Sequence, residues 1–254
     1  MTDPLPLSAS DTLTPGSLAG QRILITGAAG GLGQALSEQA AAAGAELILL
    51  DRNLEGLEAL HDRIEAAGHA QPALYPLDLL GASPEDHAEL AGKLEEALGG
   101  LDTLVHAAAE VGEPAPLALY DPETWLRTLH ANLNGAFLLI RACLPLLREQ
   151  GGRVIAVSDE CGRAGVSALG AYGVSKWALE GLVQMLAAEH SRANPVSACS
   201  VDPGPMRTAL RRYAWAGEMA DETPPPEAAA GAILGLVDPA TPFVNGAMYS
   251  VMRQ

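Results

Sequence analysis

Tyr172 and Lys176 lie four residues apart, a spacing that places both side chains on one face of a helix. A tyrosine exchanges protons poorly at neutral pH because its ordinary pKa is about 10. A nearby lysine ammonium stabilises the tyrosinate and lowers that pKa. At this spacing a lone tyrosine and lysine are usually an ordinary helical pair, but here they follow a dinucleotide-type segment. The pair therefore predicts acid–base chemistry.

That segment is the glycine-rich stretch at residues 26–33, TGAAGGLG. Glycines let the backbone turn tightly and approach a pyrophosphate, which sits on a helix N-terminus where unpaired N–H groups and the dipole favour an anion. A glycine-rich turn alone is weak evidence, but a strand before it, a helix after it and an acid ending the next strand strengthen it. We predict dinucleotide binding, with contacts from Gly27, Ala29, Gly31, Leu32 and Gly33.

The acid that ends the next predicted strand is Asp51. A carboxylate there accepts both ribose hydroxyls of NAD and repels a 2′-phosphate, so NAD(H) is favoured. Arg52 follows at once and could instead pair with a 2′-phosphate, which leaves NADP(H) open. Asp78 and Leu79, after the third strand, could hydrogen-bond the adenine amine or could belong to an ordinary turn.

The elements that must position these residues alternate regularly along the chain. Apolar strands are expected at 22–25, 47–50, 73–77, 101–105, 154–157, 196–201 and 243–251, and helices at 33–43, 54–67, 84–98, 122–147, 171–190 and after 224–226. This pattern predicts a doubly wound, Rossmann-type α/β fold with a parallel seven-stranded sheet and helices on both faces. Residues 1–19 are expected to form a flexible arm and residues 20–254 a single domain.

Composition excludes several classes of function. The 254 residues carry 15 basic and 31 acidic side chains, a net charge of −16 that argues against nucleic-acid and anionic-membrane partners. We find no apolar run of membrane-spanning length and no charged start of a secretory signal before Arg22. The three cysteines and six histidines form no metal-binding or redox motif. We expect no metal site and a reducing, cytoplasmic setting.

From about residue 20 to residue 250 the sequence resembles the short-chain dehydrogenase/reductase family. The family's Thr-Gly-x-x-x-Gly-x-Gly matches residues 26–33, and its catalytic pair matches Tyr172 and Lys176. The resemblance implies NAD(P)(H)-dependent oxidation of an alcohol or reduction of a carbonyl in a small molecule. It also implies a homodimer or homotetramer that assembles through helices at 122–149 and 170–191.

The resemblance further implies roles for single residues. Tyr172 transfers the proton, while Lys176 lowers its pKa and holds the nicotinamide ribose. Asn132 matches the asparagine that holds a proton-relay water. The remaining cofactor contacts would come from Ala107 and Ala108, which lie near the ribose, and from Pro203, Gly204 and Thr208, which match the motif that contacts the nicotinamide amide.

The sequence departs from the family at two places. The family's Asn-Asn-Ala-Gly is His106-Ala107-Ala108-Ala109 here, and the Ala109 methyl stands where backbone usually lies against the ribose. The family's catalytic serine, thirteen residues before the tyrosine, is Asp159. An ionised Asp159 would oppose Lys176 and raise the tyrosine pKa, whereas a protonated Asp159 could donate a hydrogen bond as the serine would. A local backbone shift could also bring Ser158 into the serine's place.

Residues 205–223 stand where the family keeps its substrate lid. They combine apolar Met206, Leu210, Tyr213, Trp215 and Met219 with Arg207, Arg211 and Arg212. The arginines fit either an acidic substrate or a solvated basic face. Two alternatives to a dehydrogenase stay open: a cofactor-binding sensor or assembly protein with impaired catalysis, and a dehydratase or epimerase on the same fold.

Overall fold

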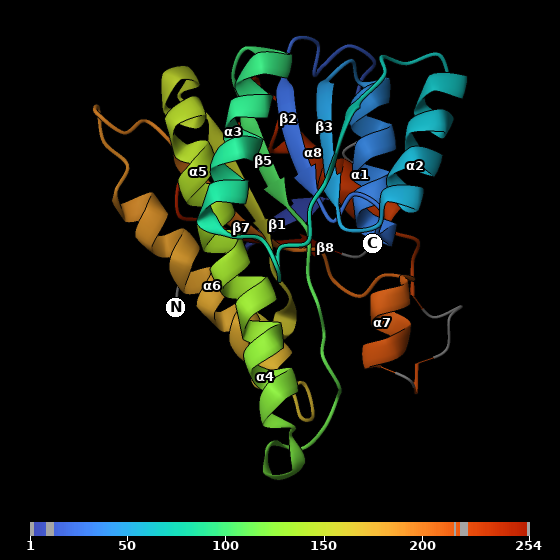
Figure 1. Cartoon of the computed structure of the whole chain (residues 1–254), viewed down its shortest axis with the longest axis vertical. Coiled ribbons are helices and arrows are strands. Elements are labelled where there is room, and N and C mark those ends of the chain that lie inside the picture. The colour runs from blue at the N-terminus through green and yellow to red at the C-terminus, as the bar shows by residue number, and fades with distance from the viewer. Residues whose placement is uncertain (1–2, 9–12, 216, 219–222, 253–254) are drawn as a thin grey trace.

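Apolar strands and helices alternate along the chain and build one sheet in which every strand pair is parallel (Figure 1). The computed structural model describes residues 3–8, 13–215, 217–218 and 223–252. The strand order is β1-β8-β7-β6-β5-β2-β3-β4. The strands are β1 (Leu5–Ser8), β2 (Arg22–Thr26), β3 (Glu46–Asp51), β4 (Ala73–Pro76), β5 (Thr103–His106), β6 (Arg153–Val157), β7 (Ser197–Asp202) and β8 (Met248–Met252). The predicted α/β doubly wound class is confirmed.

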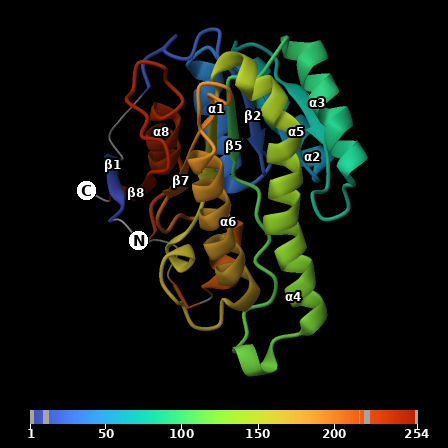
Figure 2. The same cartoon turned by 90° about the vertical axis from the view of Figure 1, so that its left-hand side faces the viewer.

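Helices cover both faces of the sheet (Figures 1 and 2). One core joins the sheet to α1 (Gly31–Ala42), α2 (Leu54–Ala66) and α8 (Glu227–Gly235). A second core, on the other face, joins it to α3 (Pro84–Leu98), α5 (Gly135–Gln150) and α6 (Gly170–Ala188). Because both faces are buried, most positions of the central strands carry apolar side chains.

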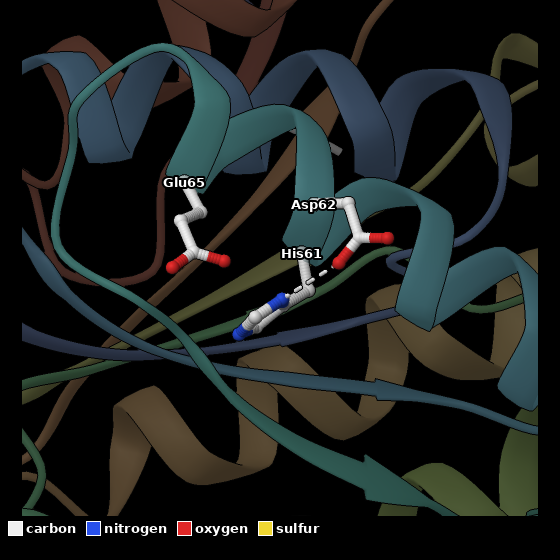
Figure 3. Close-up of side chains that lie close together, drawn as sticks. All are labelled: His61, Asp62 and Glu65. Atoms are coloured by element: carbon white, nitrogen blue, oxygen red, sulfur yellow. Dashed lines mark hydrogen bonds and ion pairs between the residues drawn. The ribbon is translucent and has the colours of Figure 1, made fainter.

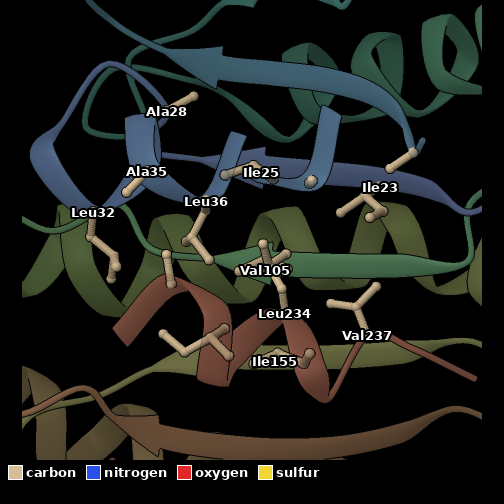
Figure 4. Close-up of a cluster of buried hydrophobic side chains, with 14 of the residues drawn as sticks. Ile23, Ile25, Ala28, Leu32, Ala35, Leu36, Val105, Ile155, Leu234 and Val237 are labelled. Carbon is tan, nitrogen blue, oxygen red and sulfur yellow. The ribbon is translucent and has the colours of Figure 1, made fainter. Parts of the chain in front are cut away.

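The first core shows how neighbouring strands share this burial (Figure 4). Ile25, Val105 and Ile155 come from three adjacent strands and are fully buried. Leu36 of α1 and Leu234 of α8 pack on the same cluster. Leu24, between Ile23 and Ile25, faces the second core instead, as the two-residue period of a strand requires.

The strand order reverses at β2, which pairs with β3 on one side and β5 on the other. The chain leaves these strands toward opposite faces, and a crevice opens at their carboxyl ends. Most of the predicted site residues lie at or just after the carboxyl ends of β2, β3, β4, β5, β6 and β7, so the fold gathers them at this edge. Asn132, Tyr172 and Lys176 reach the same edge from helical segments.

The sheet has eight strands rather than the predicted seven. The additional strand, β1, lies within the segment expected to be a flexible arm and pairs with β8, Leu5 opposite Tyr249. Pro4 and Pro6 argue against a central strand, but β1 is an edge strand, where a missing N–H is tolerated. The arm prediction is therefore wrong for residues 5–8; residues 1–2 and 9–12 lie outside the described part of the chain.

The helix expected at 122–147 is interrupted. The chain forms α4 (Pro122–Leu129), a π-helical turn at His130–Asn134, and then α5. The Gly135 N–H donates to the His130 carbonyl, five residues back. The apolar periodicity did not reveal this turn; such turns are frequent at functional sites. A short helix, α7 (Ala209–Ala214), forms after β7, and 3₁₀ turns form at Leu117–Leu119 and Glu160–Gly162. Within the described residues, no helix has the length and apolarity needed to cross a bilayer.

Candidate active site

A cleft of about 380 Å³ opens at the carboxyl ends of the strands. Every residue that the sequence analysis assigns to catalysis or cofactor binding lines it. These are Gly27, Ala29, Gly31, Leu32, Gly33, Asp51, Arg52, Asp78, Leu79, Ala107, Ala108, Asn132, Asp159, Tyr172, Lys176, Pro203, Gly204 and Thr208.

The glycine-rich turn forms one end of the cleft. Gly27 has a φ of +67°, and a Cβ placed on Gly33 would lie 2.0 Å from the Gly27 carbonyl oxygen. Both glycines are therefore required by the close packing of the turn against the start of α1. No side chain caps the N-terminus of α1 and no acidic residue lies in its first turn. Its backbone N–H groups thus fit the phosphates of a dinucleotide.

Asp51 ties the end of β3 to the glycine-rich turn. Its Oδ2 accepts a hydrogen bond from the Ala29 N–H (3.1 Å) and its Oδ1 accepts one from the Asn53 N–H (2.9 Å). A carboxylate accepts about four hydrogen bonds, so these two leave capacity for a ribose hydroxyl. Arg52 is exposed beside it, with Nη1 3.5 Å from Glu110 Oε2. At the adjacent edge of the cleft, Asp78 Oδ1 accepts from the Leu80 N–H.

Asn132 fastens the π-helical turn to the segment after β5. Its Oδ1 accepts from the Glu110 N–H, and its Nδ2 donates to the Glu110 carbonyl, both at 2.7 Å. Nδ2 also donates to Ser175 Oγ, at 2.9 Å. The Asn132 side chain is thus occupied in holding the cleft wall. Sequence reasoning missed Glu110, although it directly follows the atypical segment 106–109.

Asp159 lies in direct contact with the tyrosine. The Tyr172 hydroxyl donates to Asp159 Oδ2 at 3.0 Å, while Oδ1 accepts from the Cys161 N–H at 3.0 Å. Ser158 lies at the end of β6, where its N–H donates to the Val201 carbonyl. Ser158 Oγ is buried without a hydrogen-bond partner among the described residues. Asp159, and not Ser158, therefore stands beside the hydroxyl of Tyr172.

The electrostatics of the pair differ from the simple expectation for a tyrosine beside a lysine. Burial, and next the negative charge of Asp159, raise the pKa of Tyr172 well above its ordinary value. Burial also lowers the pKa of Lys176, an effect that the charge of Asp159 opposes. Lys176 Nζ donates to the Val157 carbonyl at 2.7 Å and lies 5.6 Å from the centre of the Tyr172 ring. The expected lowering of the tyrosine pKa is outweighed by burial and by Asp159.

His106 is structural in this arrangement. Thr26 Oγ1 accepts hydrogen bonds from the Ala107 and Ala108 N–H groups and lies 3.0 Å from His106 Nδ1. Burial, and next the charge of Lys176, lower the pKa of His106 to about 3, so its ring is neutral. Ala109 has no positive φ, so its methyl group brings no backbone strain.

The described part of the segment predicted to be a lid, residues 205–223, lines the cleft next to the glycine-rich turn. Thr208 caps α7 by accepting from the Arg211 N–H, and its methyl lies 2.9 Å from where a Cβ of Gly31 would be. Arg211 pairs with Glu218 and stacks on Trp215, its guanidinium 3.7 Å from the ring centre. The charge of Arg211 is therefore neutralised by Glu218, and this arginine does not need an acidic substrate as its partner. Met219 lies outside the described residues.

A buried ion pair secures the loop that carries Asp159. Arg163 Nε donates to Glu180 Oε1 of α6 at 2.8 Å, with the two side chains 11% and 6% exposed. Arg163 Nη1 also donates to the Tyr249 carbonyl and to Ser250 Oγ, both at 2.9 Å. Ser200 on β7 donates to the other oxygen of Glu180. The loop after β6 is thus tied to α6, β7 and β8 at once.

A group of metal-ligating residue types lies away from the cleft on α2 (Figure 3). The ligand atoms of His61, Asp62 and Glu65 all lie within 4.8 Å of one another. His61 Nδ1 is 3.2 Å from Asp62 Oδ1, and both carboxylates are exposed. Since none of the three lines the cleft, the group takes no part in the candidate site.

Comparisons with known proteins agree with this geometry. Residues 21–218 match the family model for short chain dehydrogenases. An oxidoreductase of Escherichia coli K12, YciK, named as uncharacterized, is 36% identical over 197 residues, 77% of each chain. A solved protein of Pseudomonas syringae assigned to the short chain dehydrogenases is 37% identical and superposes with a TM-score of 0.92, over 99% of this chain and 100% of that one. A similarly assigned protein of Escherichia coli CFT073, solved with NADPH, is 32% identical with a TM-score of 0.89, over 96% of this chain and 99% of that one.

The Arg163–Glu180 pair generates a prediction about stability. Replacing Arg163 with Met leaves the Glu180 charge buried and unpaired, and we expect a loss of about 3–5 kcal/mol in the free energy of unfolding. The double variant Arg163→Met/Glu180→Met should recover most of that loss. Arg127→Met, which breaks the exposed ion pair with Glu110, is the control and should cost no more than about 1 kcal/mol. Urea titration measures all three; equal losses in the single and double variants would contradict the prediction.

Proposed function

Because the chain belongs to the short-chain dehydrogenase/reductase family, we propose that it is a nicotinamide-dependent oxidoreductase. The expected reaction transfers a hydride between the cofactor and the carbon of a carbonyl or secondary alcohol. The observation that carries the proposal is the convergence of Asp159, Tyr172 and Lys176 in the same cleft as an uncapped, glycine-rich helix N-terminus.

The residues present fit a dinucleotide. The glycine-rich turn leaves no room for side chains near Gly33, and the N–H groups of α1 are free of side-chain caps. Lys176 Nζ is buried and has one hydrogen-bond acceptor, the Val157 carbonyl, among the described residues. An ammonium has three protons to donate, so two are available for the ribose hydroxyls. When bound, the nicotinamide supplies or accepts the hydride.

We assign the proton transfer to Tyr172. Its hydroxyl is buried at the reacting end of the cleft and carries a proton at neutral pH, because its pKa is raised. In the reducing direction it donates that proton to the substrate oxygen. Lys176 holds the ribose, and Asn132 keeps the wall of the cleft in place through Glu110.

Asp159 takes the position of the substrate-polarising serine. A protonated Asp159 can donate a hydrogen bond to a carbonyl oxygen, whereas an ionised Asp159 can only accept hydrogen bonds, for example from the Tyr172 hydroxyl that contacts its Oδ2. The second state gives the tyrosine a partner to which it can pass a proton during alcohol oxidation. In either state the carboxyl group is coupled to the tyrosine that performs the acid–base step.

We favour NADP(H) over NAD(H), the cofactor that Asp51 favours on sequence grounds. The relative from Escherichia coli CFT073 was solved with NADPH, and one from Shigella flexneri with NADP. Arg52 supports this choice, because its guanidinium is largely exposed at the cleft and its contact with Glu110 is long, 3.5 Å. It is therefore available to a 2′-phosphate.

We propose that copies of the chain associate through α4, α5 and α6. Figure 2 shows α4 and α6 side by side on one flank. Large apolar side chains stand exposed there, and α6 carries three at helical spacing; the set is Leu126, Phe137, Val174, Trp177 and Met185. An exposed apolar face of this kind is typical of a protein–protein interface. A homodimer or homotetramer would bury it.

We retain the cytoplasm as the proposed location. All three cysteines are free and buried, and burial raises the pKa of Cys143 to about 12. Free thiols in every cysteine position are typical of a reducing compartment.

A second candidate function is a cofactor-binding sensor with little catalysis. The raised pKa of Tyr172 favours it, since a tyrosine that holds its proton tightly is rarely ionised at neutral pH and so is rarely available as the base for alcohol oxidation. Measured turnover distinguishes the oxidoreductase from the sensor.

The assignment of proton transfer is tested at Tyr172. Tyr172→Phe keeps the ring that packs in the cleft but removes the proton, so we expect turnover to fall at least about a hundredfold with cofactor affinity unchanged. Oxidation of NADPH on a panel of ketones and aldehydes, with NADPH fluorescence as the binding measurement, tests this. Unchanged turnover would exclude Tyr172 as the acid. Cofactor binding without turnover in the wild type would favour the sensor.

The cofactor preference is tested at Arg52. We expect Arg52→Ala to weaken NADPH binding by about tenfold, one charge-assisted contact, and to leave NADH binding unchanged. Asp51→Asn is the matched variant and should improve NADPH binding, since it removes the charge that repels a 2′-phosphate. The contrary result is a wild type that binds NADH more tightly than NADPH, with Arg52→Ala weakening both equally. That result would show that the protein prefers NAD(H) and that Asp51 sets the preference.

The raised pKa of Tyr172 predicts a pH dependence. Alcohol oxidation needs a tyrosine that accepts a proton, and a raised pKa moves that ability to higher pH. Asp159→Asn removes the negative charge that helps to raise this pKa, so the pH of half-maximal oxidation should move downward. Glu160→Gln, which removes an exposed charge next to Asp159 but outside the cleft, is the control. A shift upward in Asp159→Asn, or an equal shift in both variants, would contradict the assignment.

A further inference from the structure

The Asp159 carboxylate is held rigidly at the reacting end of the cleft. Both of its oxygens are anchored, one by the Tyr172 hydroxyl and one by the Cys161 N–H, each at 3.0 Å. The residue is partly exposed and lines the cleft, so a bound molecule can reach it. Two of about four acceptor positions are used, which leaves this carboxylate able to accept a hydrogen bond from a ligand.

The charged groups around Asp159 do not cancel its negative charge. Arg163, four residues later, is already paired with Glu180. Asp202, at the end of β7, adds a second carboxyl group that interacts electrostatically with Asp159. The nearby cation is Lys176, whose ammonium is fixed on the Val157 carbonyl. The acceptor beside the reacting bond is thus an anchored acidic group.

An anchored carboxylate has opposite effects on the reduction of a carbonyl and on the reduction of a protonated carbon–nitrogen double bond. Reduction of a carbonyl places negative charge on oxygen, and an anion in contact raises the energy of that transition state. A protonated carbon–nitrogen double bond carries positive charge and an N–H donor, so the same anion stabilises it through a charge-assisted hydrogen bond. Low dielectric in a partly buried cleft increases both effects.

Apolar side chains line this part of the cleft beside Tyr172, among them Ala109, Leu210 and Trp215. These three pack against the buried cluster that holds Tyr172. Such walls suit a ring or chain without charge of its own. A ligand with an apolar body and a single nitrogen at the reacting carbon therefore matches both the walls and Asp159.

We propose that this site acts on carbon–nitrogen bonds, reducing imines in their protonated form and oxidising the corresponding amines, with Asp159 binding the nitrogen. The proposal rests on the hydride-transfer function proposed above and names its substrate class. In the reducing direction, the imine nitrogen takes a proton from solution before the step and donates it in a hydrogen bond to Asp159. The carbon then receives a hydride, the carbon–nitrogen π electrons become the nitrogen lone pair, and reduced nicotinamide dinucleotide is oxidised.

The turnover experiment uses a matched pair of substrates, the cyclic imine dihydroisoquinoline and the cyclic ketone tetralone, which share a bicyclic frame. We expect wild-type kcat/KM with NADPH to be at least about tenfold higher for the imine, which corresponds to one charge-assisted hydrogen bond. Asp159→Ser should lower the imine-to-ketone ratio at least about tenfold. Preference for the ketone in the wild type, or the same ratio in both proteins, would overturn the proposal.

A binding experiment keeps the proposal testable without turnover. The protonated amine tetrahydroisoquinoline, which keeps an N–H donor, and neutral tetralin share a bicyclic frame, and their binding is followed by protein fluorescence with and without NADPH. The wild type should bind the cation about tenfold more tightly, and Asp159→Asn should lose that preference. Glu160→Gln, of equal charge change outside the cleft, should keep it. Equal preference in wild type and Asp159→Asn would overturn the proposal.

The two experiments separate this proposal from the proposed function. Absence of binding of both NADPH and NADH would remove the oxidoreductase function. NADPH binding with efficient ketone reduction and no preference for the cation would keep that function and remove only the assignment to carbon–nitrogen bonds.

Discussion

The reversal of strand order at β2 is the constraint on which the site depends. Because β3 and β5 flank β2 and the chain leaves toward opposite faces, the carboxyl edge of the sheet stays open at this point. The glycine-rich turn, Asp51, the segment after β5 and Asp159 each follow a strand that ends at this edge. Residues separated by more than a hundred positions in the sequence meet there because parallel strands present their ends together.

Burial of charge is the second organising feature of the site. Lys176 is buried with a carbonyl as its partner, and Asp159 holds the hydroxyl of a buried tyrosine. Such groups persist in a low-dielectric interior only when hydrogen bonds fix them. The Arg163–Glu180 pair extends this to the supporting loop, so that the geometry around Tyr172 is set by polar contacts from α6, β7 and β8 rather than by apolar packing alone.

Much of this arrangement could be predicted from the sequence, because it rests on local rules. The spacing of Tyr172 and Lys176 and the glycines at 27 and 33 encode a helix face and a tight turn, and apolar runs encode buried strands. Other features depend on contacts between distant segments. No local sequence signal predicts three of these features: the edge pairing of β1, the π-helical turn at Asn132, and the hydrogen bonds of Asn132 to the Glu110 backbone. Whether Asp159 or Ser158 meets Tyr172 depended on the backbone after β6, which spacing alone left open.

The pairing of β1 with β8 joins two strands that lie almost a whole chain apart. During synthesis on a ribosome, β1 emerges before β8 and remains unpaired with it for a time on the order of tens of seconds at ordinary translation rates. Contacts of such sequence separation form late because closing the loop between them costs entropy. Until then this edge of the sheet is formed by another strand and not by β1, which contains Pro6, and exposed edges are sites of intermolecular strand pairing. The β1 strand can therefore dock on the sheet only after β8 has been made.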